Sequence, residues 1–388
     1  MTSLVSIAFY ANKDTYVFND AESLLCRASR YRHYYGLNAT DISGGESTIF
    51  VDPALTKRGL KHKHSDGRND HLAYLVRHCA NIGLAPSIIT HGANNTEALT
   101  KQIEDAGLDT WEFSLHGLGE HNGVVYGRSH EALVVGHGNR AVPDHFGRMV
   151  DNAAFADRPV RWNISVTGHT YLDLPGWARF VTERFPATVG NMIVWMAYDS
   201  WGPDNVPEWM KNYTDYAPYI AEAVGILEAA GFEANVRYFP LCLAKEWGFA
   251  ANTHQHYQIQ MDPWEWSYEA TSDKVLQHPY ADVERGKITE EEFMRQAVSL
   301  RTRSCDAHAR QRQPKSPPCQ SCAARNICEG PDSLYLHQFG HEYLTPIRSE
   351  DVGLPEDGVL ADVNFFLRAG DDASLRKGAV KDEQKVLA

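Results

Sequence analysis

The chain has 388 residues, of which 43% are apolar, and a formal net charge of −13. This acidic balance argues against a nucleic-acid groove as the main site, because phosphate binding needs a basic surface. The sequence has no run of about 18 apolar residues and no basic N-terminal segment followed by an apolar one, so we expect no membrane span and no secretory signal. Its seven cysteines then indicate a reducing cytoplasm, where clustered cysteines bind metal more often than they form disulfides.

Strand-like and helix-like segments alternate along the first part of the chain. The expected strands are Ser3–Tyr10, Ala39–Ser43, Pro86–Thr90, Thr110–His116, Val160–Val166, Asn191–Ala197 and Ala234–Phe239. The expected helices are Ala21–Tyr35, His71–Ile82, 95–107, 141–153, 174–185 and 214–231. This alternation predicts an α/β fold, a partial or full parallel βα barrel with its chemistry at the carboxyl ends of the strands.

The sequence pattern changes after residue 240, where it becomes irregular and richer in Trp, Pro and Cys. We therefore predict a barrel domain over 1–240, a smaller Cys-rich extension over 241–370 and a charged, frayed tail over 371–388. The stretch Thr56–His71 is rich in Lys, Arg and His. We interpret it as a solvated loop, with a histidine metal site as the alternative.

The segment Asp41-Ile-Ser-Gly-Gly-Glu-Ser47 follows an expected strand. A Gly-Gly pair lets the backbone approach a ligand closely, and its free N–H and C=O groups can pair with the ammonium and carboxylate of an amino acid. Glu46 adds a carboxylate for a positive charge. The alternative interpretation is an ordinary turn between a strand and a helix.

This segment resembles the Gly-Gly-Glu-Pro motif of radical SAM enzymes, with Ser47 in place of Pro. Four later segments resemble further strand ends of that family: Ser87-Ile-Ile-Thr-His-Gly92, Glu112-Phe-Ser-Leu-His-Gly117 followed by Glu120-His-Asn122, Asn163-Ile-Ser165 and Val236-Arg-Tyr-Phe-Pro-Leu-Cys242. The resemblance spans residues 38–240. It implies a barrel that binds S-adenosylmethionine (SAM), with cofactor contacts from Gly44, Gly45, Glu46, Thr90, Ser114, Asn163 and Ser165.

The resemblance also implies a four-iron cluster held by a Cys-x3-Cys-x2-Cys triad after the first strand, which this sequence does not contain. Three explanations stay open. If Ser3–Tyr10 is the first strand, the loop Ala11–Asp20 should carry the triad, and it has no cysteine. If Met1, Val5 and Ala8 stand at the triad positions, all three ligands are replaced and the first strand is absent. The cysteines could also precede Met1 in a longer chain.

Two other cysteines are not expected to bind a cluster. Cys26-x3-Arg30-x2-His33 has the triad spacing, but arginine is not an iron ligand and the segment has the pattern of an amphipathic helix. Cys79 falls on the apolar stripe of the helix predicted over His71–Ile82, so we expect it in the core.

The strongest metal signature is Cys319-x2-Cys322-x5-Cys328. A Cys-x2-Cys turn directs two thiolates at one ion, and a third cysteine close by restrains the site. Cys305 and Cys242 are the candidates for the fourth ligand. Spacing does not separate zinc from iron–sulfur, and reduced cysteines without metal are the alternative. The resemblance implies an auxiliary [4Fe-4S] cluster, as in radical SAM enzymes with SPASM- or twitch-like extensions.

His116 and His121 follow the expected fourth strand and are the candidate catalytic residues, since histidine can serve as an acid or base near neutral pH. The alternative is that both make ordinary polar contacts.

Three hypotheses of function follow. The first is a radical SAM enzyme that acts on a small molecule or peptide through a 5′-deoxyadenosyl radical and receives electrons from a donor protein. The second is a non-catalytic binding or partner subunit that keeps the SAM pocket but lacks the radical-generating cluster. The third is a βα-barrel enzyme of another class with a structural zinc. We expect a cytoplasmic protein with no nucleic-acid or membrane partner.

Overall fold

The computed structural model describes residues 2–6, 8–12, 15–18, part of 21–32, 39–43, 46–119, 121, 145–185, 193–194, 210–232, 234, 236, 239–244, 286–289, 291–292, 316–325, 328, 330–331, 333–356 and 358–359. The chain divides into two compact units. The first comprises Met1–Asn163 and Ile259–Asp306, and the second comprises Ile164–Gln258 and Ala307–Ala388. The domain limits expected from the sequence, 1–240, 241–370 and 371–388, stay a prediction.

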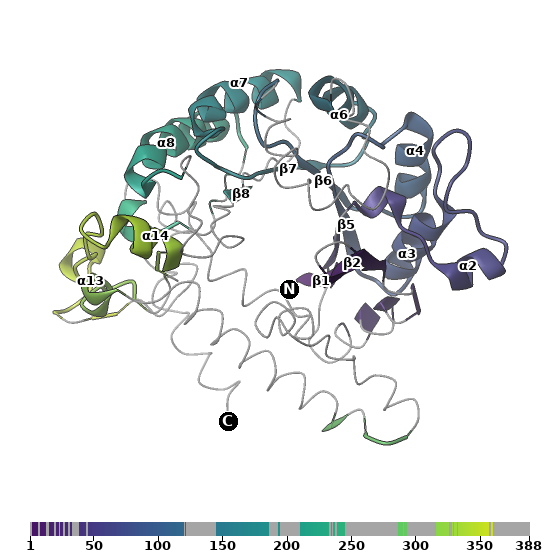
Figure 1. Ribbon diagram of the computed structural model, residues 1–388, viewed down its shortest axis with the longest axis horizontal. Coiled ribbons are helices and arrows are strands. Elements are labelled where there is room, and N and C mark those ends of the chain that lie inside the picture. Colours follow the sequence, from purple (N-terminus) through teal and green to yellow (C-terminus); the bar gives the residue numbers. More distant parts are fainter. Residues whose placement is uncertain are drawn as a thin grey trace. The chain divides into compact units, whose positions relative to one another are not determined.

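The first unit is built on a parallel sheet (Figure 1). Its strands lie in the order β1 (Thr2–Ser6), β4 (Ala39–Ser43), β5 (Ala85–Thr90), β6 (Thr110–Ser114) and β7 (Val160–Ile164). Every neighbouring pair is parallel. The connections carry the helices α3 (Asp70–Asn81), α4 (Glu97–Asp105) and α6 (His145–Ala153). The predicted α/β class is confirmed, as a parallel sheet consistent with a partial βα barrel.

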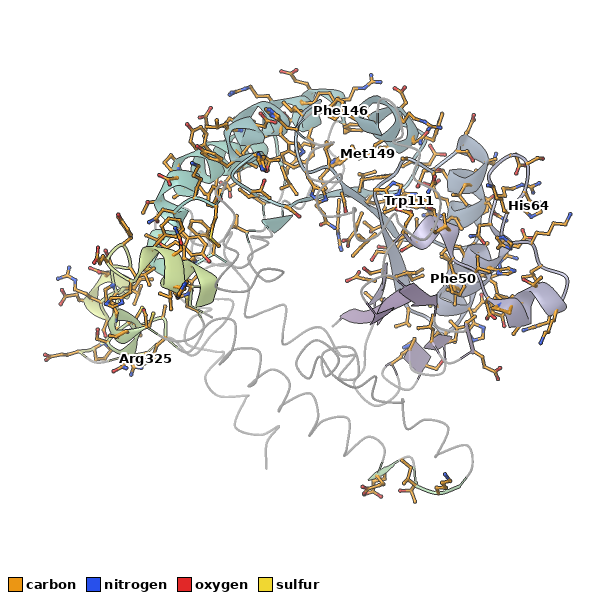
Figure 2. All side chains as sticks on the ribbon, in the orientation of Figure 1. Phe50, His64, Trp111, Phe146, Met149 and Arg325 are labelled. Atoms are coloured by element: carbon orange, nitrogen blue, oxygen red, sulfur yellow. The ribbon has the colours of Figure 1, made fainter. Side chains whose placement is uncertain are left out.

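The two faces of this sheet differ in chemistry because successive side chains on a strand point to opposite sides. One face is apolar and fully buried, with Ile42, Ile88, Trp111, Phe113 and Trp162. Trp111 lies on this face (Figure 2), and its indole N–H donates to Glu104 Oε1 of α4 at 3.0 Å. Strands of parallel sheets usually have apolar side chains on both faces. The other face departs from that rule, because it carries the polar residues Asp41, Ser87, Glu112, Arg161 and Asn163.

The sheet begins at β1, which pairs with β4 in parallel register, Leu4 opposite Asp41. The single strand predicted over Ser3–Tyr10 is therefore wrong in extent. A second strand, β2 (Ala8–Asn12), pairs antiparallel with β3 (Thr15–Phe18), so part of the predicted loop Ala11–Asp20 is a hairpin. The apolar and aromatic run hides this break, because it continues unchanged from one strand into the next. The explanation in which the first strand is absent is also excluded, since β1 occupies that place.

The basic segment Thr56–His71 is mainly the loop predicted there, because residues 58–69 form turns and irregular chain and are mostly exposed or half-buried, and only its two ends belong to helices. Helix α2 (Pro53–Lys57) begins after Asp52, whose Oδ1 accepts from the Ala54 N–H at 2.7 Å. Proline at the first helical position and an aspartate cap are the usual signals of a helix start. His71, the last residue of the segment, is buried, and its Nδ1 accepts from the Asp52 N–H at 2.9 Å. That ring is thus held by the protein backbone.

The second unit is mainly helical in its described part. It contains η2 (Tyr171–Asp173), α7 (Leu174–Arg184), β8 (Ile193–Val194), α8 (Tyr213–Ala229), η4 (Leu241–Leu243), α13 (Pro317–Gln320), α14 (Ser333–Phe339) and η6 (Glu350–Val352). Asn212 caps α8 in a capping box with Asp215. The Tyr335 hydroxyl of α14 donates to the same Asn212 side chain at 2.8 Å, which ties the Cys-rich segment to the start of α8. None of the helices described in either unit is long and apolar enough to span a bilayer.

Candidate functional site

Glu46, which directly follows the two glycines of the strand-end motif, lies buried at the N-cap of η1 (Ser47–Ile49). Its Oε1 accepts from the Thr48 N–H at 3.1 Å, from the Thr90 hydroxyl at 2.6 Å and from the Thr48 hydroxyl. Its Oε2 accepts from the His91 N–H at 3.0 Å and contacts His91 Nε2 at 3.1 Å. A carboxylate offers about four lone-pair positions. Donors from the protein itself therefore occupy the lone-pair positions of this carboxylate.

The pKa of Glu46 lies below its ordinary value of 4.5. Burial alone would raise the pKa, but the charge of the His91 ring and the hydrogen bonds from Thr48, Thr90 and the His91 backbone outweigh it. Thr90 ends β5, so these bonds fasten the carboxyl ends of two neighbouring strands to each other. The surroundings of Glu46 thus favour an ionised side chain that clamps the strand ends.

The other predicted cofactor residues lie at different places. Ser114 is the last residue of β6 and is half-buried. Asn163 belongs to β7, and its Nδ2 donates to Glu112 Oε2 at 3.3 Å. Ser165 follows β7, falls in the second unit, and accepts through its carbonyl from the Thr170 hydroxyl at 3.2 Å. Gly44 and Gly45 lie outside the described residues. The structure therefore joins Glu46 to Thr90 by a hydrogen bond, and the assignment of the whole set to a cofactor stays a prediction.

The two candidate catalytic histidines both lie beyond the end of β6. His116 is half-buried, whereas His121 is exposed and donates its backbone N–H to the Leu118 carbonyl at 3.1 Å. Their catalytic role stays a prediction.

An ion pair on the polar face of the sheet is the feature that sequence reasoning missed. Glu112 of β6 and Arg161 of β7 are opposite each other in register, and Arg161 Nη1 donates to Glu112 Oε1 at 3.1 Å. The Glu112 side chain is only 6% exposed and that of Arg161 is 35% exposed. The sequence places both residues on strands, but their partnership depends on which strands are neighbours and in what register.

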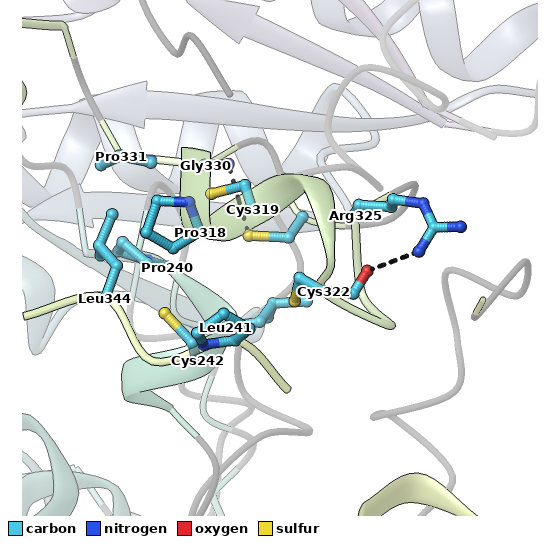
Figure 3. Close-up of a pocket in the computed structure, with 12 residues that line it drawn as sticks. Pro240, Leu241, Cys242, Pro318, Cys319, Cys322, Arg325, Gly330, Pro331 and Leu344 are labelled. Carbon is cyan, nitrogen blue, oxygen red and sulfur yellow. Dashed lines mark hydrogen bonds between the residues drawn. The ribbon is translucent and has the colours of Figure 1, made fainter. Parts of the chain in front are cut away.

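Four cysteines of the second unit line one pocket (Figure 3). Cys242 lies in η4, Cys319 in α13, and Cys322 and Cys328 in the turns that follow. Of the two candidates for the fourth member, Cys242 thus lies with the C-terminal cysteines, whereas Cys305 lies outside the described residues. None of the described cysteines forms a disulfide.

Donors from the protein surround the sulfur atoms in this pocket. The Gly330 N–H donates to Cys328 Sγ and the Ile347 N–H to Cys322 Sγ, both at 3.4 Å. The Ser316 hydroxyl lies 3.2 Å from Cys319 Sγ. Hydrogen bonds of this kind tune thiolates that ligate metals. Burial, together with the neighbouring thiols, raises the pKa of Cys242 to about 12, and a bound cation would act in the opposite direction, because coordination deprotonates a thiol.

The donor type suits zinc or an iron–sulfur cluster, but the sulfur positions do not complete such a site. In the part of the chain that the structure describes, no three His, Cys, Asp or Glu side chains converge closely enough to hold a metal ion. The four cysteines thus share a pocket without the convergence of ligands around one centre. Metal binding there requires the thiols to turn toward a common point.

No protein-family model matches the chain, and no curated protein matches it in sequence. Among solved structures it is similar to SuiB of Streptococcus suis bound to S-adenosylmethionine, at 12% identity and a TM-score of 0.42, over 63% of this chain and 52% of that chain. The chain thus spans about half the length of SuiB.

Two further similar structures are named after dihydrodipicolinate synthase. One is a monomeric variant of that enzyme, at 14% identity and a TM-score of 0.38, over 79% of this chain and 95% of that chain. The other is a dihydrodipicolinate synthase family protein of Coccidioides immitis, at 13% identity and a TM-score of 0.35, over 97% and 96% of the two chains. Similarity at this level concerns the fold alone.

Proposed function

We propose that this chain is a SAM-binding βα-barrel protein of radical SAM type that also carries a metal centre, an auxiliary iron–sulfur cluster, on Cys242, Cys319, Cys322 and Cys328. The observation that carries the proposal is the position of Cys242. It is remote in sequence from the other three cysteines, yet it lines the same pocket. Metal sites of this kind usually have four ligands. A fourth ligand must lie beside the Cys-x2-Cys turn, whereas an unrelated cysteine need not.

In this proposal the four cysteine ligands come from three segments of the chain. Cys319 and Cys322 supply the paired thiolates, while Cys328 and Cys242 complete the set from two other segments. The N–H groups of Gly330 and Ile347 stabilise negative charge on the sulfur atoms. When bound, an iron–sulfur cluster would supply electron transfer or a contact to substrate.

The SAM part of the proposal rests on the carboxyl ends of the parallel strands, where ligands bind in βα folds. Gly44, Gly45, Ser114, Asn163 and Ser165 are the proposed contacts. Glu46 and Thr90 are positioning residues in this proposal and do not contact the cofactor. Their hydrogen bonds hold the ends of β4 and β5 together. Because protein donors already occupy the Glu46 carboxylate, we propose that the backbone of the strand-end motif recognises the cofactor.

Binding is better supported than radical generation. The triad of the family follows the first strand, and here no cysteine occurs between β1 and Cys26. This favours a protein that binds SAM without the radical-generating cluster. A radical SAM enzyme acting on a small molecule or peptide is the second candidate, and a zinc-containing barrel of another class is the third.

Metal analysis of protein prepared without oxygen separates the three candidates. We expect about four iron and four sulfide per chain, as one cluster requires. About eight iron would favour the radical enzyme, and zinc without iron would favour the third candidate. Protein without either metal would overturn the metal centre.

Two matched variants identify the fourth ligand. Cys242→Ser should lose most of the bound metal, because an alcohol is a poor ligand for soft metals, whereas Cys305→Ser should keep it. Metal content per folded chain is the measurement, with circular dichroism as the control for folding. The opposite pattern would assign the fourth position to Cys305.

A calorimetric titration with SAM tests the cofactor. We expect binding by the wild type and loss of affinity in Gly45→Val, because the proposed contact needs the close backbone approach that only glycine allows. The matched control is Gly225→Val, at an exposed position of α8 where the backbone is not left-handed and a Cβ would meet no atom within 4 Å. Absence of SAM binding by the wild type would exclude the cofactor assignment.

A further inference from the structure

The polar face of the sheet in the first unit holds a charge cluster of which the proposed function uses only Asn163. Arg161 and Asn163 of β7 each hold one oxygen of the Glu112 carboxylate, at 3.1 and 3.3 Å. On the strands beyond, the Ser87 hydroxyl of β5 donates to the Asp41 carboxylate of β4. The charge of Asp41 also reaches Arg161. Four neighbouring strands thus contribute to one cluster.

Two polar atoms of this cluster have unsatisfied hydrogen-bonding capacity. Within the described part of the chain, Arg161 Nε and Asn163 Oδ1 are buried and have no hydrogen-bond partner. One is a donor and the other an acceptor. Buried polar groups of native proteins are nearly always paired, and an unpaired one carries a cost in stability. An ion pair in a largely buried position also adds little to the stability of a protein. Apolar side chains of similar volume in its place often stabilise the fold equally well.

The charges of the cluster limit what can satisfy these two atoms. One guanidinium stands against the two carboxylates of Glu112 and Asp41, so the local charge is negative and a third anion is disfavoured. A simple cation offers only donors, and it would leave Arg161 Nε unpaired. A neutral group that carries an acceptor and a donor, such as a carboxamide or a ring lactam, satisfies both. The Arg161 side chain keeps 35% of its surface exposed, so solvent reaches part of this side chain.

We propose that Arg161 and Asn163, positioned by Glu112, form a binding site for a neutral carboxamide or lactam group of a small-molecule ligand. Arg161 Nε donates to the ligand carbonyl, and Asn163 Oδ1 accepts from the ligand N–H. The inference does not depend on the metal centre, and it shares one residue, Asn163, with the proposed SAM contacts.

Ligand-observed NMR with matched probes tests this site. Propionamide, propionate and propylammonium have similar size and differ in charge and in hydrogen-bonding pattern. We expect the wild type to bind propionamide at least about tenfold more tightly than either charged probe, since each of them leaves one buried group unpaired. Equal binding of the three probes, or tighter binding of propionate, would overturn the proposal.

Two variants and one control connect this selectivity to the residues. Arg161→Lys keeps the charge but removes the Nε donor, so the preference for propionamide should disappear. Asn163→Asp is nearly isosteric and should transfer the preference to propylammonium. Arg179→Lys, in an exposed ion pair on α7, should change nothing. Thermal unfolding of each variant shows whether it folds, and unaltered selectivity in folded Arg161→Lys and Asn163→Asp would reject the site.

A repeat of the titration with saturating SAM identifies the source of the group. SAM contains no carboxamide or lactam, so undisturbed binding of propionamide supports a second molecule as the ligand. Displacement would mean that SAM itself occupies this position, and it would overturn the assignment to a separate carboxamide or lactam ligand. If SAM does not bind while the selectivity persists, only the SAM assignment fails.

Discussion

Glu46 is the residue whose expected role changes most once its contacts are known. The motif predicts a carboxylate for the positive charge of a cofactor, whereas the structure surrounds both oxygens with protein donors. We therefore expect Glu46→Gln to lower the free energy of unfolding by about 2–3 kcal/mol, since hydrogen bonds to a charged group are lost and an amide N–H faces donors. Urea unfolding measures this, and Glu183→Gln, exposed on α7, is the control with little change.

The same carboxylate gives the fold a dependence on acid. Because the pKa of Glu46 is lower in the folded chain than its ordinary 4.5, its contribution to stability is fully present above pH 4.5. That contribution is lost as the pH falls through the lowered pKa. Unfolding free energies measured from pH 6 down to pH 3 should therefore decline less in Glu46→Gln than in the wild type. Parallel pH profiles of the two proteins would contradict this assignment.

At the scale of elements, the turn after β5 depends on a glycine. Gly92 has φ +77°, and a Cβ there would lie 2.7 Å from Met149 Cγ of α6 and 2.8 Å from Phe113 Cδ1 of β6. Gly92→Ala should cost about 3 kcal/mol of unfolding free energy, the sum of the left-handed backbone and an overpacked contact. Gly59→Ala has a similar φ, +87°, and open space, so it should cost about 1 kcal/mol. Equal losses of unfolding free energy in the two variants would show that the contacts of Gly92 with Met149 and Phe113 add nothing to the cost.

The elements also show how far the sequence alone leads. Periodicity places the cores of β4, β5, β6 and β7 and of helix α3 correctly, because each has one strongly apolar face. It misses the hairpin β2–β3, where aromatic residues continue up to the turn, and the helix α2, whose five residues are too few to show a helical period. The pair of Glu112 with Arg161 depends on strand register, and the approach of Cys242 to Cys319 depends on tertiary folding. Neither can be read from spacing.

At the scale of the whole molecule, the two units should respond differently to metal. All four cysteines of the pocket belong to the second unit. A metal present at about 100 times its dissociation constant stabilises the state that binds it by about 2.7 kcal/mol. Chelation should therefore lower the melting temperature of that unit by roughly 5–10 °C and leave the first unit unchanged. Calorimetry measures both transitions, with Cys242→Ser as the control that no longer responds. Equal shifts of both would place the metal elsewhere.

The different burial of the cysteines has a practical consequence for chemical labelling. Cys79 is 1% exposed, and burial raises its pKa to about 12, so alkylating reagents should reach it only on unfolding. Cys319 and Cys328 are half-buried. In a mass-spectrometric footprint, Cys79 thus serves as an internal standard for intact protein. Modification of Cys319 in protein whose Cys79 stays unmodified then reports the fraction of intact protein with an empty thiol pocket before any assay begins.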